Sequence, residues 1–226
     1  METLHVPETV PVMTLPHTVF FPQALLPLHI FEPRYQEMLR DVLATNRIFA
    51  VAHLDTDRRQ KNESSEPLHH IASIGIVRAC QKDENNTSNL LLQGLCRVEV
   101  KKILREKPYR VIAVQPISTI AGTHQAELEL LRLEVMRLLN LRRRLGTPVP
   151  KGMTQFLDSI DDVDTFADIA AFNLCEDSSL KQQLLETLET KQRLQLFAKS
   201  LKSEIEILRL RRKLQGHLPD DGIVNN

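Results

Sequence analysis

Two lysine–serine pairs, Lys199-Ser200 and Lys202-Ser203, have the residue types of a serine nucleophile activated by a lysine base. They lie in a stretch with a helical pattern, and adjacent residues on a helix do not face each other. No oxyanion site is apparent beside them in the sequence. We therefore interpret both pairs as part of a solvated helix face and expect no catalytic residue here.

A second candidate for chemistry is the alternating set His53, Asp55 and Asp57. In an extended backbone these side chains point to one side, where imidazole and carboxylate groups could hold a metal ion. They equally fit the end of a strand that runs into a polar loop, and we favour this interpretation. His69 and His70 would point to opposite faces, and no H-E-x-x-H motif occurs. We expect neither a metal nor a cofactor.

The three cysteines, Cys80, Cys96 and Cys175, are far apart in the sequence, and no C-x-x-C motif occurs. This pattern is typical of reduced, buried thiols in a cytoplasmic protein and not of a disulfide framework. Cys96 alternates with Val98 and Val100, so we expect it to be a small core residue. None of the three has an obvious activating neighbour in the sequence.

The composition argues against several classes of function. The chain of 226 residues has 29 basic and 29 acidic side chains, so its formal net charge is zero, and it contains no tryptophan. Nucleic-acid-binding surfaces usually combine excess positive charge with aromatic residues for stacking. None of the seven glycines belongs to a G-x-x-x-x-G-K-[ST] phosphate loop. Because neither a signal peptide nor a membrane span is apparent, we expect a cytoplasmic protein. Because none of the candidate groups above forms a catalytic site, we do not expect an enzyme.

The segment from residue 19 to residue 34 is the best candidate for a binding surface. A strand sends alternate side chains to opposite faces, so its apolar residues cannot all point inward, and an exposed apolar patch marks a partner site. Glu32 and Arg34 could bind a peptide terminus or side chain. Alternatively, Glu32 is a carboxylate favoured at the start of a helix, and Arg34 is a surface group. The candidate peptide-binding residues are Phe20, Phe21, Leu25, Leu26, Glu32 and Arg34.

Residues 1–118 have the pattern of strands with one helix. Pro33 suits the first position of that helix, where a missing N–H costs nothing. Gly94 interrupts the longest strand, which predicts a bulge or a sharp bend. Beyond Gly94, Arg97 alternates with apolar neighbours, so we expect it on the solvent face. We predict strands at 11–15, 25–31, 48–54, 70–80, 90–104 and 109–115 (the last closed by Pro116), a helix at 32–46, an exposed loop at 55–67 and a hairpin connection at 82–89.

Residues 119–226 have the pattern of helices. Thr123 is the expected cap of a helix that ends near residue 144, and Asp162 and Asp177 are expected caps of later helices. We predict helices at 123–144, 151–160, 162–173, 177–187 and 188–214. The apolar seam of the last helix comprises Leu194, Ala198, Leu201, Ile205 and Leu208. The expected fold class is α+β, with a small, mostly antiparallel barrel followed by a helical bundle that ends in a long helix.

Four motifs make the chain resemble the substrate-binding N-terminal domain of the Lon proteases, over roughly residues 10–215. Individually they are moderately specific, but their order across both halves makes them specific together. The first is Leu15-Pro16, Phe21-Pro22, Leu26-Pro27-Leu28 and Phe31-Glu32-Pro33-Arg34-Tyr35; the second is Gly94-Leu95 with Arg97; the third is Ser159-Ile160-Asp161-Asp162 with Ala167-Asp168 and Ile169-Ala170; the fourth is Ser203-Glu204-Ile205 with Leu208.

The resemblance implies a PUA-like barrel over residues 1–118 and a helical bundle over residues 119–226, as in stand-alone relatives that lack the ATPase and peptidase domains of Lon. It implies a non-enzymatic module that binds unfolded or degron-bearing polypeptide through an apolar surface, with an ATP-dependent protease as a partner in trans and no membrane. The alternative is an RNA-binding PUA-like module, suggested by the basic runs at 142–144 and 209–213 and weakened by the zero net charge. The sequence leaves a homodimer through the long helix open.

Overall fold

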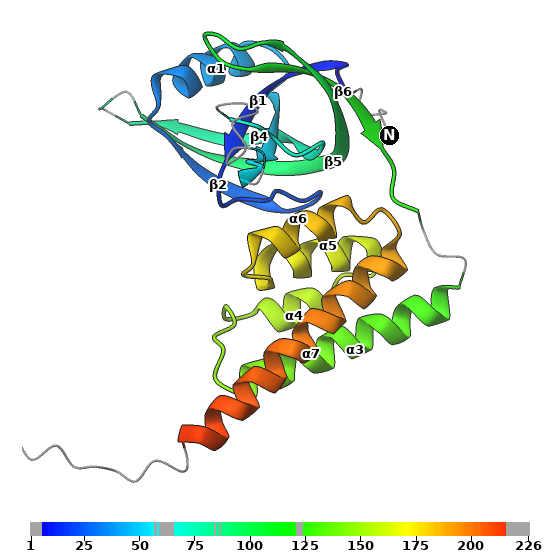
Figure 1. Ribbon diagram of the computed structural model, residues 1–226. Helices are drawn as coiled ribbons and strands as arrows, with labels where there is room; N and C mark the ends of the chain where they lie inside the picture. The colour runs from blue at the N-terminus through cyan, green and yellow to red at the C-terminus, as the bar shows by residue number, and fades with distance from the viewer. Residues whose placement is uncertain are drawn as a thin grey trace, which may run out of the picture.

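The protein consists of two stacked parts, a strand-rich part from the first half of the chain and a helical part from the second (Figure 1). The computed structural model describes residues 6–56, 58, 66–83, 85, 87–120 and 124–215. The α+β class expected from the sequence is confirmed. Among the described helices, none combines the length and apolar character that crossing a membrane requires.

The strand-rich part is a closed barrel with one extra edge strand. A single sheet runs in the order β2-β5-β4-β3-β1-β6, and β6 also pairs with β5, which closes the ring. Among the strand pairs of the described residues, β1–β3 is parallel and the others are antiparallel. The first half of β5 pairs with β2 and its second half with β6, so β2 lies outside the closed ring. The elements are β1 (Thr9–Leu15), β2 (Leu25–Ile30), α1 (Pro33–Leu43), β3 (Ile48–His53), β4 (Ile71–Lys82), β5 (Ser88–Arg105) and β6 (Val111–Ile117).

The predicted irregularity at Gly94 is confirmed. The register between β4 and β5 shifts there, because Ile74 pairs with Cys96 whereas Gly75 pairs with Gly94. A β-carbon on Gly94 would lie 2.1 Å from the carbonyl oxygen of Phe21. Glycine is therefore required because the backbone of the segment before β2 passes directly over the bend.

Several predicted boundaries differ from the structure. Pro116 lies inside β6, opposite Val98, and does not close the strand. The first helix of the second half begins after His124, so the predicted cap at Thr123 is wrong, and Thr123 itself lies outside the described residues. Pro33 does occupy the first position of α1. Most of the predicted 55–67 loop also falls outside the described ranges.

The helical part is a bundle built around two long helices that run side by side in the same direction (Figure 1). Ion pairs Lys191–Glu127 (2.7 Å) and Lys202–Glu134 (2.6 Å) connect them. The predicted caps at Asp162 and Asp177 are confirmed, since both side chains accept backbone N–H bonds. The helices are α3 (Gln125–Arg144), α4 (Met153–Asp158), α5 (Val163–Leu174), α6 (Ser178–Glu186) and α7 (Thr190–Gln215).

The seam of α7 is buried within its own bundle. Leu194, Ala198, Leu201 and Ile205 are all almost inaccessible, whereas Leu208 is half-buried. The apolar cluster that holds them continues through α5 into the segment before β2 and under α1. A second, smaller apolar cluster fills the barrel itself. The bundle and the barrel are thus packed against each other through one shared core.

Candidate functional site

A buried ion pair joins the barrel to the bundle. Arg97 in β5 donates two hydrogen bonds to the carboxylate of Asp168 in α5, at 2.6 and 2.7 Å. Arg97 also donates to the carbonyl of Leu185 at the end of α6. The expectation that Arg97 faces solvent is wrong, because α5 and α6 cover that face of the strand. Strand alternation indicated which residues share a face but could not show that helices would cover it.

Arg193 of α7 extends this pair into a network. Its guanidinium donates to Asp168 and to Asp164, both at 2.8 Å. Thr190 and Thr119 donate hydroxyl hydrogen bonds to Asp164 as well. Burial alone raises the pKa of Asp164, but Arg193 and the two hydroxyls more than offset it, so the pKa lies below its ordinary value. The network holds β5, α5 and α7 in one fixed arrangement.

The network of Arg97, Asp168 and Arg193, which we call the joint, lies next to the segment that leads into β2. Arg97 lies over the ring of Phe21, with 6.0 Å from its guanidinium carbon to the ring centre, and Phe20 meets Phe172 of α5 edge to face at 6.4 Å. The buried hydroxyl of Ser73 donates to the carbonyl of Phe20 at 2.6 Å. Phe20 and Phe21 are 1% and 0% exposed, so their predicted surface position is wrong. They precede β2 in a loop between two apolar layers, where strand alternation does not apply.

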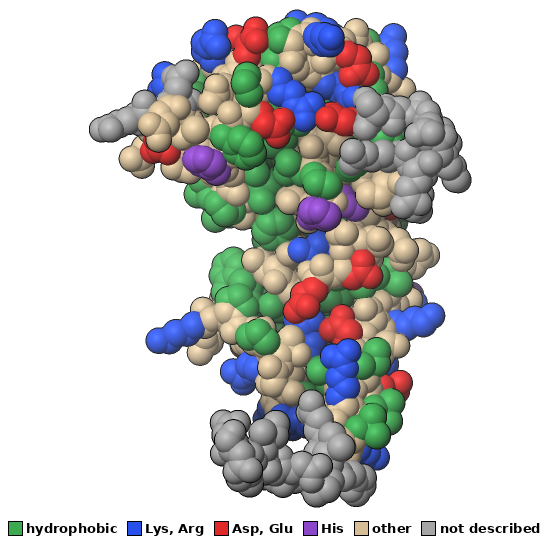
Figure 2. Space-filling view, turned by 60° about the vertical axis from the view of Figure 1, so that its left-hand side comes forward, with side chains coloured by type: hydrophobic (Ala, Val, Ile, Leu, Met, Phe, Trp, Pro, Cys, Tyr) green, Lys and Arg blue, Asp and Glu red, His purple; other side chains and the backbone are tan. Residues whose placement is uncertain are grey.

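β2 itself does expose an apolar face. Its outward residues Leu25, Pro27 and His29, together with Phe31 just beyond the strand, form what we call the β2 stripe. Leu25 is 52% exposed and Phe31 is 61% exposed. Leu26 alternates with them and is buried, so its predicted exposure is also wrong. Figure 2 shows hydrophobic side chains gathered on the face of the barrel just above the helices, where β2 runs in Figure 1.

The outer edge of β2 carries Pro27 at a backbone position that faces away from the sheet. The N–H of Gly94 donates to the carbonyl of Ala24 at 2.9 Å, and such ladder bonds recur at every second residue of an antiparallel pair. The backbone groups of Leu25, Pro27 and His29 therefore point to the outer edge. Proline has no N–H, so it interrupts this edge and blunts its capacity to add another strand.

Polar contacts border the stripe. His29 hydrogen-bonds Asn89 of β5 at 2.8 Å and stacks on the ring of Phe31 at 6.1 Å. On the other side of β5, Arg78 donates to the side chain of Gln93 at 2.6 Å. The cross-strand neighbour of Pro27 is Leu91, which is half-exposed and extends the apolar surface onto β5. An apolar strip with a polar border can bind an apolar segment and orient it.

Glu32 and Arg34 lie at the end of the stripe beyond Phe31, but they are engaged with other side chains. Arg34 donates to Glu32 at 2.9 Å and to both carboxylate oxygens of Glu66 at 3.0 Å. Its guanidinium also lies over the ring of Tyr35, at 4.6 Å. These contacts connect the start of α1 to the strand-flanking segment at residue 66, so a peptide that used Arg34 would compete with Glu32 and Glu66.

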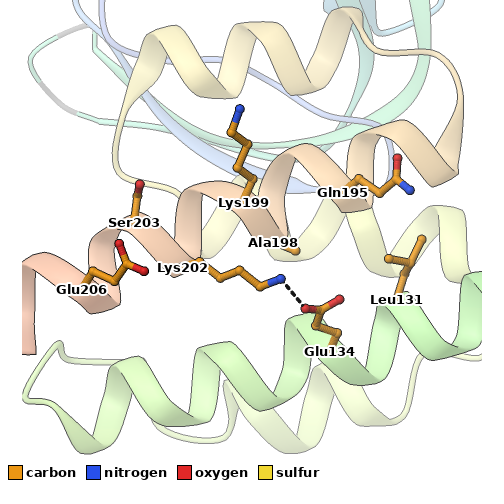
Figure 3. Close-up of a pocket in the computed structure, with 8 residues that line it drawn as sticks. All are labelled: Leu131, Glu134, Gln195, Ala198, Lys199, Lys202, Ser203 and Glu206. Carbon is orange, nitrogen blue, oxygen red and sulfur yellow. Dashed lines mark ion pairs between the residues drawn. The ribbon is translucent and has the colours of Figure 1, made fainter.

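The lysine–serine pairs lie on α7. Figure 3 shows Lys199, Lys202 and Ser203 lining a groove of about 450 Å³ between α3 and α7, in which Lys202 pairs with Glu134 across the floor. Lys202 is therefore a cation held by a carboxylate and not a base for the neighbouring serine.

His53, a member of the alternating histidine–aspartate set, contacts other protein groups. His53 is buried; its Nε2 donates to the carbonyl of Pro16 at 3.1 Å, and its ring stacks on His69 at 5.2 Å. Its Nδ1 has no hydrogen-bond partner among the described residues. Nowhere in the described ranges do three or more metal-binding side chains converge, and Asp57 lies outside those ranges.

The cysteines differ from one another in exposure. Cys80 is exposed, which contradicts the expectation of buried thiols, and Cys96 is half-buried. Cys175 is buried, and burial raises the pKa of its thiol to about 11. Such a thiol is protonated at neutral pH and unreactive.

The family described as the ATP-dependent protease La (LON) substrate-binding domain matches residues 9–203. The Lon protease of Desulfosudis oleivorans is 27% identical over 215 residues, which cover 95% of this chain and 26% of that protein. The Lon protease of Dictyoglomus thermophilum is 28% identical over 225 residues, or 97% of this chain and 27% of that protein. The chain thus spans about a quarter of these curated relatives.

Solved structures share the fold. The N-terminal domain of a Mycobacterium avium complex Lon protease superposes with a TM-score of 0.66 at 16% identity, covering 86% of this chain and 98% of that one. A Lon N-terminal domain protein from Xanthomonas campestris gives a TM-score of 0.58 at 21% identity, with coverage of 83% and 95%. At these identities the likeness concerns the arrangement of the barrel and the bundle.

Proposed function

This chain belongs to the family of ATP-dependent protease La (LON) substrate-binding domains, and from that premise we propose that it binds unfolded or degron-bearing polypeptide on the β2 stripe. The observation that carries the proposal is an edge strand whose solvent face is apolar, with Leu25 52% and Phe31 61% exposed. Folded chains seldom leave such side chains in a row unless a partner covers them. The matched family region is a binding domain, so we assign the chain no catalytic role of its own.

Apolar side chains of the client would supply most of the binding energy at this surface. Fully burying an exposed leucine or phenylalanine contributes about 1.5–3 kcal/mol, and association has its own entropic cost. A single client segment on the stripe would therefore bind weakly, with a Kd of about a micromolar or higher. Because Pro27 interrupts the outer edge, the apolar side chains of the client supply most of the recognition. Weak, sequence-tolerant binding suits a module that samples unfolded chains.

Two details extend the proposal. Glu32 and Arg34 lie next to Phe31 and form the polar end of the surface, where a client carboxylate would compete with Glu66 for Arg34. An ATP-dependent protease acting in trans is the partner that would receive the client, since the family occurs as the substrate-binding part of such enzymes. Phe20, Phe21 and Leu26 support the surface from beneath and do not touch the client.

The test is binding of labelled β-casein, an unfolded chain, followed by fluorescence anisotropy. We expect the double variant Leu25→Ser/Phe31→Ser to lose most of the binding. The matched control is Leu130→Ser/Leu133→Ser on α3, whose residues are 67% and 63% exposed in the native protein. An equal loss of casein binding in both double variants would mean that non-specific hydrophobic contact, and not the β2 stripe, binds the client. Failure of the native protein to bind would end the proposal.

A further inference from the structure

The distal end of α7 carries a second exposed apolar row, far from β2. Ile207, Leu210 and Leu214 are 51%, 59% and 69% exposed. Their spacing of three and four residues places them on one side of the helix. In Figure 1 the last turns of α7 extend past the end of α3, so the bundle leaves this side uncovered. We call these three residues the α7 stripe.

Exposed basic side chains gather at the distal ends of α3 and α7, near the α7 stripe. The ends of α3 and α7 meet here, since Arg212 donates to the carbonyl of Arg144 at 3.3 Å. Within the described part of the chain, no ion pair involves any of the exposed cations at this end. The cations are Arg143, Arg144, Arg209, Arg211, Arg212 and Lys213. A chain of zero formal net charge therefore gathers, among its described residues, several exposed cations without ion pairs near one apolar row.

Arg142 shows that this charge is not simply a helix-end effect. It belongs to the same basic run but is buried, where it pairs with Glu204 at 2.9 Å and donates to the carbonyl of Leu174. The structure thus neutralises the arginine that faces the bundle and leaves the others exposed. Positive charge at a helix C-terminus is generally favourable, because the macrodipole places about half a negative charge there. The ends of α3 and α7 together would offset about one positive charge, whereas six exposed cations lie at this end.

We propose that the distal end of α7 binds an acidic amphipathic helix of another protein. The three–four spacing of the α7 stripe is that of the a and d positions of a heptad repeat, which another helix matches with its own apolar row. In this register Glu204 and Glu206 occupy the e and g positions before Ile207, whereas Arg211 and Lys213 occupy the e and g positions between Ile207 and Leu214. Those two cations flank the row of the α7 stripe. Acidic residues at the corresponding positions of the partner would pair with them. This surface is separate from the β2 stripe, so the proposal does not depend on client binding there.

The charge distribution selects this partner over a second copy of the chain. Two copies side by side would bring the cations at 209–213 of each together, and like charges at flanking positions oppose pairing. Nucleic acid would use the cations but not an aliphatic row, and the α7 stripe contains no aromatic side chain for stacking. A membrane surface would attract the same cations but would give no role to the heptad spacing.

The groove beside the α7 stripe offers such a helix room to continue. Ser203 lies one turn before Ile207 on α7, and it lines the groove of about 450 Å³ together with Glu206 and Lys199 (Figure 3). Lys199 points away from α3 in this view, whereas Lys202 reaches across to Glu134. A partner helix seated on the α7 stripe would therefore meet a further exposed cation, Lys199, which forms no ion pair with any described residue, on its way toward the barrel.

The test uses a synthetic three-heptad peptide with leucine at positions a and d and glutamate at positions e and g, labelled with fluorescein. We expect it to bind the full chain and to weaken as salt is raised. The variants Ile207→Ser/Leu210→Ser and Arg211→Glu/Lys213→Glu should each lower its affinity at least about tenfold. The control Arg40→Glu/Arg137→Glu reverses two exposed charges elsewhere and should leave binding unchanged. All these side chains are exposed, so folding is preserved.

Four results would overturn the proposal. One is failure of the acidic peptide to bind, and another is equal binding of a peptide with lysine at e and g. A third is a dimer of the chain alone in sedimentation velocity that Ile207→Ser/Leu210→Ser abolishes. The last is binding of the α7 end to homopolymeric RNA or to phosphatidylserine vesicles, lost in Arg211→Glu/Lys213→Glu, when the acidic peptide does not bind.

Discussion

Arg97 of β5 and Asp168 of α5 meet 71 residues apart in the sequence, through two hydrogen bonds of 2.6 and 2.7 Å, with both side chains almost fully buried. Arg97 belongs to the second of the four motifs described above, and Asp168 belongs to the third. Gly94 of the second motif lets the segment before β2 pass close to the sheet, and Arg97 then holds the bundle against it. These two motifs thus contribute to the contact between the barrel and the bundle.

Asp168→Ala should destabilise the protein strongly. The substitution leaves Arg97 and Arg193 buried without their shared carboxylate, which typically costs about 3–5 kcal/mol. Urea unfolding followed by circular dichroism measures the change. The control is Glu99→Gln, which breaks the exposed pair with Lys101 and should cost less than about 1 kcal/mol. A similar small loss in both variants would show that the joint does not hold the halves together.

Phe20→Ala and Leu25→Ser should separate stability from binding. Phe20 is buried against Phe172, and truncating a buried phenylalanine costs about 3–5 kcal/mol. Leu25 is 52% exposed, so its replacement should leave the unfolding midpoint nearly unchanged while it weakens client binding. Denaturant unfolding and casein anisotropy on the same samples check both. If Phe20→Ala instead weakened casein binding and left stability unchanged, Phe20 would have to lie at the surface in solution.

Pro27→Thr should make the outer edge of β2 competent to add a strand. The new N–H points outward beside those of Leu25 and His29, and threonine favours strands. We expect the variant to bind extended apolar peptides more tightly or to self-associate, as seen by anisotropy and sedimentation velocity. Its added binding should vanish with a peptide N-methylated at alternate residues, whereas binding by the native protein should change little. No gain in Pro27→Thr would show that β2 offers no usable edge.

Stability should fall on mild acidification because of His53. Burial, and then the neighbouring His69, lowers the pKa of His53 below its ordinary value of 6.5. The unfolded chain therefore binds the proton first, and stability is full above about pH 6.5 and declines as the pH falls toward the lower folded-state pKa. Urea midpoints between about pH 7.5 and pH 5.5 measure this decline.

His53→Gln is the variant that isolates this effect. Glutamine can keep a donor to the carbonyl of Pro16 but does not titrate, so the decline should become shallower in that pH range. Glu186 has a pKa lowered first by its hydrogen bond with His69, and its contribution is lost only as the pH falls below its ordinary value of 4.5. An unchanged slope in His53→Gln would assign the acid sensitivity to other groups.

Much of the fold is readable from the sequence because it depends on neighbours along the chain. Asp162 and Asp177 cap helices with bonds to N–H groups two or three residues away, and Pro33 starts α1 because of its own ring. The apolar spacing of α7 indicates its buried face, and Gly94 marks the bend of β5. Each of these signals lies within a few residues of the feature it predicts.

The positions that tertiary structure decides are those whose environment comes from distant elements. Arg97 follows the alternation of a solvent-facing residue, yet α5 and α6 cover it, and Asp168 of α5 is the partner that offsets its burial. Phe20 and Phe21 are buried because a loop passes between the barrel and α5, whereas Leu25, equally apolar, is exposed because β2 lies at an edge. The sequence determined which elements form and which residues share a face. Only the packing of those elements decided which faces remain open to a partner, because burial depends on what lies opposite a residue in space.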